Sequence, residues 1–141
     1  MKEYPWGKGT PKWVRDAALN DSDKTFTVPA GKVWLMRAIY NKLVTTATVG
    51  NRLLSVMFAP DGTNAETWFS GPNHAASTTQ RYRMSFEGVT DDIVVNDGGV
   101  IMGFPVMVLP AGATIRIYDS AAIDAAADDL TVVLHYVEYD A

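Results

Sequence analysis

The residues that could carry catalysis are few in this chain, and their spacing assembles no recognisable site. The sequence holds no cysteine and two histidines, His74 and His135. A nucleophilic triad needs a histidine that is held by a carboxylate and faces a serine or cysteine, and the sequence offers neither that arrangement nor a G-x-S-x-G elbow. The two histidines also lack the pairing of a zinc motif. We interpret them as a loop residue and a sheet-surface residue, and we expect no enzymatic activity and no cofactor.

The carboxylates gather in two loops and offer a second kind of chemistry. Calcium binds where several oxygens converge from a loop, but no EF-hand spacing is present, and a solvated acidic loop is the alternative. Catalysis of glycoside hydrolysis would need two carboxylates across a cleft, which sequence cannot show. Calcium binding therefore stays open for both groups: Asp91, Asp92 and Asp97, and Asp119, Asp124, Asp128 and Asp129.

Charge and hydropathy limit the classes of partner that we expect for this chain. The chain of 141 residues has a net charge of −4, and no phosphate-binding glycine motif occurs in it. Arg81 and Arg83 flank Tyr82, which we interpret as a solvated sheet face and not as a nucleic-acid site. No apolar run is long enough to span a membrane, and the N-terminus is not a secretory signal. We expect neither a nucleic-acid nor a membrane partner.

Residues 1–24 are predicted to form an extended arm. Prolines and glycines interrupt regular structure at the start, and one helical turn is expected over 14–19. The first fifteen residues carry four basic side chains and one acidic one, whereas the remainder is acidic. The aromatic residues of the arm cannot be buried by the arm itself, so we expect it to bind a partner, with packing onto its own domain as the alternative. The predicted contact residues are Tyr4, Trp6, Lys8, Lys12, Trp13 and Arg15.

From residue 25 onward the hydrophobic pattern has period two, which indicates strands. The segment 32–44 is apolar on both faces and should be a central strand, with Trp34, Met36, Ala38 and Tyr40 on one face and Val33, Leu35, Ile39 and Leu43 on the other. We predict an all-β antiparallel sandwich over 25–141, a jelly roll of about eight strands, with an immunoglobulin-like sandwich as the alternative. The other expected strands lie near 52–59, 66–70, 80–86, 91–99, 100–109, 113–119 and 130–139.

The tripeptide Pro-Ala-Gly occurs at 29–31 and again at 110–112. Proline presets the entry of a turn, and glycine relieves crowding at its far end. Each copy should turn the chain sharply between two strands, and two such corners fit a fold made from two packed sheets.

These segments resemble a known group of proteins. "FTVPAGKVWLMRAIYNKLVTTATVGNR" at 26–52 and "LPAGATIRIYDSAAIDAAADDLTVVLHYVEY" at 109–139 are similar to small virion proteins of tailed bacteriophages. The resemblance covers about 25–139, with little match over 60–100, and it leaves the arm outside. Its motifs are turn and strand signatures and carry no catalytic residues.

The resemblance implies a jelly-roll capsid cement, or decoration, protein. Such a protein would be made in the cytoplasm of the bacterial host and would sit on the capsid surface of the virion. Its partners would be the major capsid protein, whose neighbouring subunits it bridges, and further copies of itself in a homodimer or homotrimer. The alternative is a receptor- or carbohydrate-binding module of a tail or fibre, in which Trp68 and Tyr82 would contact sugar rings.

Overall fold

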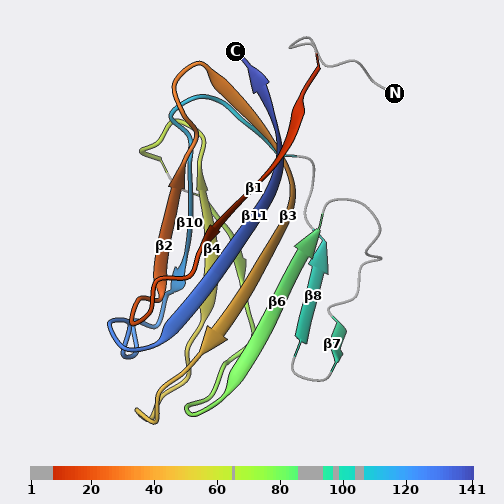
Figure 1. Cartoon of the computed structure of the whole chain (residues 1–141). Helices are drawn as coiled ribbons and strands as arrows, with labels where there is room; N and C mark the ends of the chain where they lie inside the picture. The colour runs from red at the N-terminus through yellow and green to blue at the C-terminus, as the bar shows by residue number, and fades with distance from the viewer. Residues whose placement is uncertain (1–7, 65, 86–93, 97–98, 104–106) are drawn as a thin grey trace.

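The computed structural model describes residues 8–64, 66–85, 94–96, 99–103 and 107–141, and the structural statements below concern these residues. They form strands and turns without a helix (Figure 1). The strands are β1 (Thr10–Asp16), β2 (Asp23–Thr27), β3 (Lys32–Val44), β4 (Leu54–Ala59), β5 (Glu66–Ser70), β6 (Thr79–Ser85), β7 (Val94–Asn96), β8 (Gly99–Gly103), β9 (Val108–Leu109), β10 (Thr114–Asp119) and β11 (Asp129–Asp140).

The strands form two sheets that face each other (Figure 1). The large sheet has the order β1-β11-β3-β6-β8-β7, with β9 pairing an end of β3. The small sheet has the order β2-β10-β4-β5. All described strand pairs are antiparallel except β6 and β8, which run parallel.

The pairing is nested, and this identifies the fold. β1 pairs with β11, β2 with β10, β3 with β6 and β4 with β5, so that the chain forms one long antiparallel ribbon with the β4–β5 hairpin at its tip. Wrapping the ribbon adds two further contacts, β11 with β3 and β10 with β4. This arrangement is a jelly roll, in which β7, β8 and β9 are an insertion between β6 and β10. The predicted sandwich of about eight framework strands is thereby confirmed.

A β-bulge in β3 changes the predicted faces of that strand. His135 pairs with Ala38 and Tyr136 with Met36, which leaves Arg37 without a partner in β11. One extra residue reverses the alternation of side chains beyond it. The prediction that Trp34 and Met36 share a face with Ala38 and Tyr40 was therefore wrong, because the core contains Trp34, Met36, Ile39 and Leu43.

The N-terminal segment differs from the expected irregular arm over 1–24. Residues 10–16 form β1, the edge strand of the large sheet, and the predicted helical turn over 14–19 is absent because β1 extends to Asp16. Proline is tolerated in an edge strand, where its missing N–H costs no ladder bond, so Pro11 does not prevent pairing. Before the strand, Gly9 approaches β11 so closely that a Cβ there would overlap a methyl carbon of Val137.

The two Pro-Ala-Gly turns lie side by side at one end of the sandwich. In each, the residue after glycine donates its N–H to the proline carbonyl, at 3.2 and 3.1 Å, and the glycine has a positive φ of 71° or 83°. Val28 joins the two turns, since its N–H donates to Ala113 at 2.9 Å and its carbonyl accepts from Gly112 at 3.0 Å. The repeat thus marks two adjacent crossings between the sheets, from β2 to β3 and from β9 to β10.

We predict that Gly62→Ala destabilises the fold more than Gly31→Ala does. Both glycines have similar positive φ values, 76° and 71°, but a Cβ on Gly62 would lie 2.6 Å from the carbonyl oxygen of Gly112, whereas nothing lies within 4 Å of one on Gly31. We expect Gly31→Ala to cost about 1 kcal/mol from backbone strain and Gly62→Ala about 2 kcal/mol or more. Gly62 lies in the turn between β4 and β5, and Gly112 in the second Pro-Ala-Gly turn. Urea unfolding of the two variants measures the difference in stability. Equal losses would contradict the close packing of these two turns against each other.

Candidate functional site

The acidic residues of the β10–β11 connection build a buried polar cluster instead of an open site. Arg52 and Asp128 are fully buried and form a bidentate ion pair, with Nε of Arg52 2.7 Å from Oδ2 of Asp128 and Nη2 3.2 Å from Oδ1. The other guanidinium nitrogen, Nη1, donates to the carbonyls of Thr48 and Gly50 at 2.7 and 2.8 Å. The ion pair is therefore fully hydrogen-bonded, as a buried charge pair must be.

Two neighbouring carboxylates are also engaged. Asp119 accepts from the backbone N–H groups of Leu53, Ala121 and Ile123. Asp124 accepts from two threonine hydroxyls, and these bonds lower its pKa. No group of three His, Asp or Glu residues suited to a metal ion occurs in the described part of the chain. Asp91, Asp92 and Asp97 lie outside the described residues.

His74 lies in the β5–β6 connection, in agreement with its interpretation as a loop residue, and it is buried in this cluster. Its backbone pairs with Arg52 in an isolated bridge, and its Nδ1 lies 3.2 Å from the hydroxyl of Tyr82. Burial lowers the pKa of His74 and raises that of Tyr82 to about 12. Tyr82 is 2% exposed, so the prediction that it contacts a sugar ring is wrong. Trp68 belongs to β5, but its side chain lies outside the described part.

The outward face of the large sheet gathers aromatic and cationic side chains from four strands. Strand register places Trp13, His135 and Ala38 in one row across β1, β11 and β3. The next row contains Arg15, Val133, Tyr40 and Arg83, and a third places Lys42 beside Arg81. Arg37 lies at the bulge of β3 and completes this surface, which we call the cationic face. Its members are Trp13, Arg15, Arg37, Tyr40, Lys42, Arg81, Arg83 and His135.

The aromatic side chains of the cationic face are in contact. The rings of Trp13 and His135 stack at a centroid distance of 3.9 Å with an interplanar angle of 4°, and Tyr40 stacks on Trp13 at 6.0 Å. The guanidinium of Arg83 lies over the Tyr40 ring, 5.4 Å from its centre. Trp13 is nevertheless 58% exposed, so a large ring is held in place and still presented to solvent.

The cations of this face have no anionic partners among the described residues. Elsewhere in the described chain, apart from exposed Lys8, every lysine and arginine forms an ion pair: Lys12, Lys24, Lys32, Arg52 and Arg116. None of the five cations on the face does. Among the described residues of β1, β3, β6 and β11, one carboxylate occupies an outward register position. This is Asp129, which lies at the first residue of β11 and accepts the N–H of Asn20. Lys42 and Arg81 occupy directly opposite positions, where like charges are destabilising.

The predicted contact residues divide into four groups. Trp13 and Arg15 belong to the cationic face, and Lys8 is exposed just before β1. Lys12 instead forms a 2.6 Å ion pair with Glu138, whose second oxygen accepts from Trp34 Nε1 at 3.0 Å. Tyr4 and Trp6 lie outside the described residues. Sequence analysis missed Arg37, Tyr40, Lys42 and His135 as members of the face and interpreted Arg81 and Arg83 as merely solvated.

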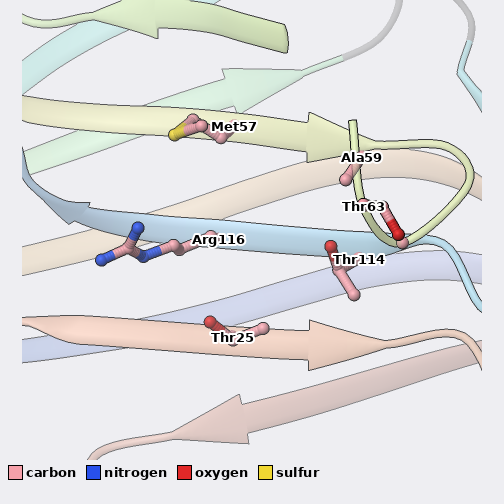
Figure 2. A pocket seen from close by; sticks show the side chains of 7 residues that line it. Thr25, Met57, Ala59, Thr63, Thr114 and Arg116 are labelled. Carbon is pink, nitrogen blue, oxygen red and sulfur yellow. The ribbon is translucent and has the colours of Figure 1, made fainter. Parts of the chain in front are cut away.

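The small sheet has a shallow hollow of about 150 Å³ on its outward face (Figure 2). Its one charged side chain, Arg116, donates to both oxygens of Asp23 at 2.8 and 2.5 Å, so this charge is already satisfied. The hollow therefore offers no unpaired charged side chain to a charged ligand. It is lined by Thr25, Met57, Ala59, Gly62, Thr63, Thr114 and Arg116.

Comparison with known proteins gives no family. No protein-family model and no curated protein sequence matches the chain. Among solved structures, it is similar to a chain of turnip yellow mosaic virus, with 8% identity, coverage of 99% of this chain and 85% of the other, and a TM-score of 0.37. Chains from the nora virus structure (8%, 99% and 63%, 0.34) and from infectious bursal disease virus strain Gx (11%, 95% and 42%, 0.29) are also similar. TM-scores below 0.5 do not establish a common fold, so the architecture rests on the strand pairing of this chain.

We predict that Asp128→Ala strongly destabilises the protein. Removing one partner of a buried ion pair leaves an uncompensated charge, which costs about 3–5 kcal/mol. The matched control is Asp140→Ala, because Asp140 pairs with Lys32 at the exposed surface, where water and salt screen the pair and its loss changes stability little. Chemical unfolding measures both, and a small loss for Asp128→Ala would contradict the structural role of the pair.

We predict that the contact between β1 and β11 weakens in acid. The hydrogen bond from Lys12, and to a lesser extent that from Trp34, lowers the pKa of Glu138 below its ordinary value of 4.5, against the opposing effect of burial. A lowered pKa in the folded state means that this stabilisation is complete above the ordinary value and is lost as the pH falls through the lowered one. Amide hydrogen exchange in β1, corrected for intrinsic rates, should therefore rise below about pH 4. In Glu138→Gln this pH dependence should largely disappear; an unchanged profile would contradict the role of Glu138.

Proposed function

We propose that this chain is a virion structural protein of a tailed bacteriophage. Its sequence resemblance lies in 26–52 and 109–139, and in the structure these two segments pair with each other along β3–β11 and through the end of β2 with β10. The resembling residues thus form the centre of the jelly roll and not a peripheral loop. Jelly rolls occur in viral capsid proteins and also in lectins and cupins. The function must therefore be argued from the interior and the surface of this chain and not from its fold.

The interior of this jelly roll is occupied by its own core. Aliphatic and aromatic side chains from both sheets fill the space where an internal ligand would have to bind, among them Met36, Leu54, Ile115 and Leu134. The polar residues at the end of the sandwich are bonded to each other, as described for Arg52 and Asp128. We therefore look for function on the outer surface.

The observation that carries the proposal is the cationic face. Exposed tryptophan, together with tyrosine and arginine, is typical of the central residues of protein interfaces. Within the proposal, the face binds the outer shell of the capsid, and the segment before β1 reaches the neighbouring major capsid protein subunit. Many copies on one lattice act together, so modest single contacts stabilise the whole head.

Self-association into dimers or trimers is part of the same proposal. β1 is an edge strand of the large sheet and offers free backbone groups for pairing with another copy. A nucleic-acid or membrane partner is not part of it. No helix among the described residues is long and apolar enough to cross a membrane.

The location and copy number of the protein in purified virions test this function. Cement predicts hundreds of copies on the head surface, whereas a few copies at one vertex would favour the alternative of a tail or fibre module. Absence of the chain from purified virions of the phage that encodes it would refute a structural role.

We predict different effects for two N-terminal deletions. Removing residues 1–7 leaves β1 intact, so the variant should fold with an unchanged thermal midpoint but load poorly onto virions that lack the protein. Removing residues 1–16 also deletes β1, exposes the inner edge of β11 and should lower the midpoint clearly. Calorimetry and a sedimentation assay of loading measure the two effects. Normal loading without residues 1–7 would show that these residues are not needed for binding to the capsid.

A further inference from the structure

We propose that the cationic face binds an acidic protein surface, with Trp13 as the central anchor and Arg15, Lys42, Arg81 and Arg83 as partners for its carboxylates. This inference rests on the proposed function and deepens it, because it names the chemistry that the shell must present. It goes beyond the arm, since most of these residues belong to the body of the sandwich.

The charge arrangement argues for an anionic partner. Apart from Lys8, the other described lysines and arginines form ion pairs with carboxylates, whereas the five cations of the face have no carboxylate partner among the described residues. The cross-strand pair of Lys42 and Arg81 is unfavourable in the free protein. A carboxylate placed between them replaces this repulsion by two attractive contacts. Relief of the repulsion therefore makes the free energy of binding more favourable.

The geometry suits several carboxylates at once. Arg81 and Arg83 alternate on β6, which places them about 7 Å apart, and adjacent strands are about 4.8 Å apart. Each guanidinium can hold a carboxylate through two parallel N–H donors. His135 adds a flat support for Trp13 and little charge, because burial, and then the positive charge of Arg37, lowers its pKa. The tryptophan is therefore fixed before binding, which reduces the entropy lost when the partner binds.

The surroundings favour protein over nucleic acid. An apolar residue lies among the charged ones, since Val133 stands between Arg15 and Tyr40 in one row. Such mixed apolar, aromatic and arginine surfaces are typical of protein interfaces.

A symmetric contact between two copies through this face is disfavoured. A twofold interface places the same patch of both copies together, and here that would oppose two sets of unpaired cations. The occupant is therefore a different surface, one rich in aspartate and glutamate.

Binding of the full chain to labelled poly-L-glutamate tests the inference in solution. Fluorescence anisotropy at low salt should show that Arg81→Gln with Arg83→Gln weakens binding about tenfold or more, and that Trp13→Ala also weakens it. Arg116→Gln, which removes one exposed arginine from the outward face of the other sheet, should change it less than about twofold. Because the substituted side chains point to solvent, circular dichroism should show folded variants.

Three results would overturn the inference. One is equal binding by the double variant and Arg116→Gln. Another is tighter binding of oligothymidylate than of poly-L-glutamate at the same salt, which would point to nucleic acid. The third is self-association that disappears in the double variant, which would point to a second copy.

Loading onto virions separates this inference from the proposed function. If the wild-type chain loads and the double variant does not, while Arg116→Gln does, both proposals are supported. If all three load equally, the cationic face is not the docking surface although the virion role stands. If the wild-type chain does not load at all, the proposed function fails, and the poly-L-glutamate measurements alone decide the partner chemistry of the face.

Discussion

The buried ion pair between Arg52 and Asp128 is the constraint on which the fold most depends. In this jelly roll, the connections β1–β2, β3–β4, β5–β6 and β10–β11 all cross between the sheets at one end. Their backbone groups lie over the core and must be hydrogen-bonded. Arg52 binds the carbonyls of its own connection, pairs through its backbone with His74 and holds Asp128, while Asp128 accepts the N–H of Thr46. One buried pair thus joins three of the four crossings.

This use of polar residues explains why the reactive side chains of the described cluster are engaged by the protein itself. Asp119, Asp124 and Asp128 accept hydrogen bonds from the protein itself, and His74 packs against Tyr82 inside the same cluster. Free interaction capacity is found instead on one sheet face. The two sheets differ in this respect, because Arg116 on the small sheet is paired with Asp23, whereas Arg81 and Arg83 on the large sheet have no carboxylate partner among the described residues.

Sequence analysis could predict what depends on local alternation. It gave β3 its full range, placed Arg81 and Arg83 outward on β6 and identified both Pro-Ala-Gly turns, since each of these depends on neighbouring residues only. It could not predict that Lys42 lies opposite Arg81, because the register between distant strands is set by tertiary packing. It also missed β1, since prolines and glycines indicate irregular structure and give no sign of an edge position that tolerates them.

The bulge at Arg37 makes the core and the cationic face compatible on one strand. Before the bulge, even-numbered residues such as Trp34 and Met36 point into the core, and beyond it the odd-numbered Ile39 and Leu43 do. Without the extra residue, Trp34 and Met36 would point to the opposite face from Ile39 and Leu43, and Tyr40 and Lys42 would point inward whenever Trp34 did. The single inserted position therefore buries the apolar residues of both halves while it leaves Tyr40 and Lys42 beside Arg83 and Arg81. A proposed contact surface and the packing of the interior are in this way fixed by the same local irregularity.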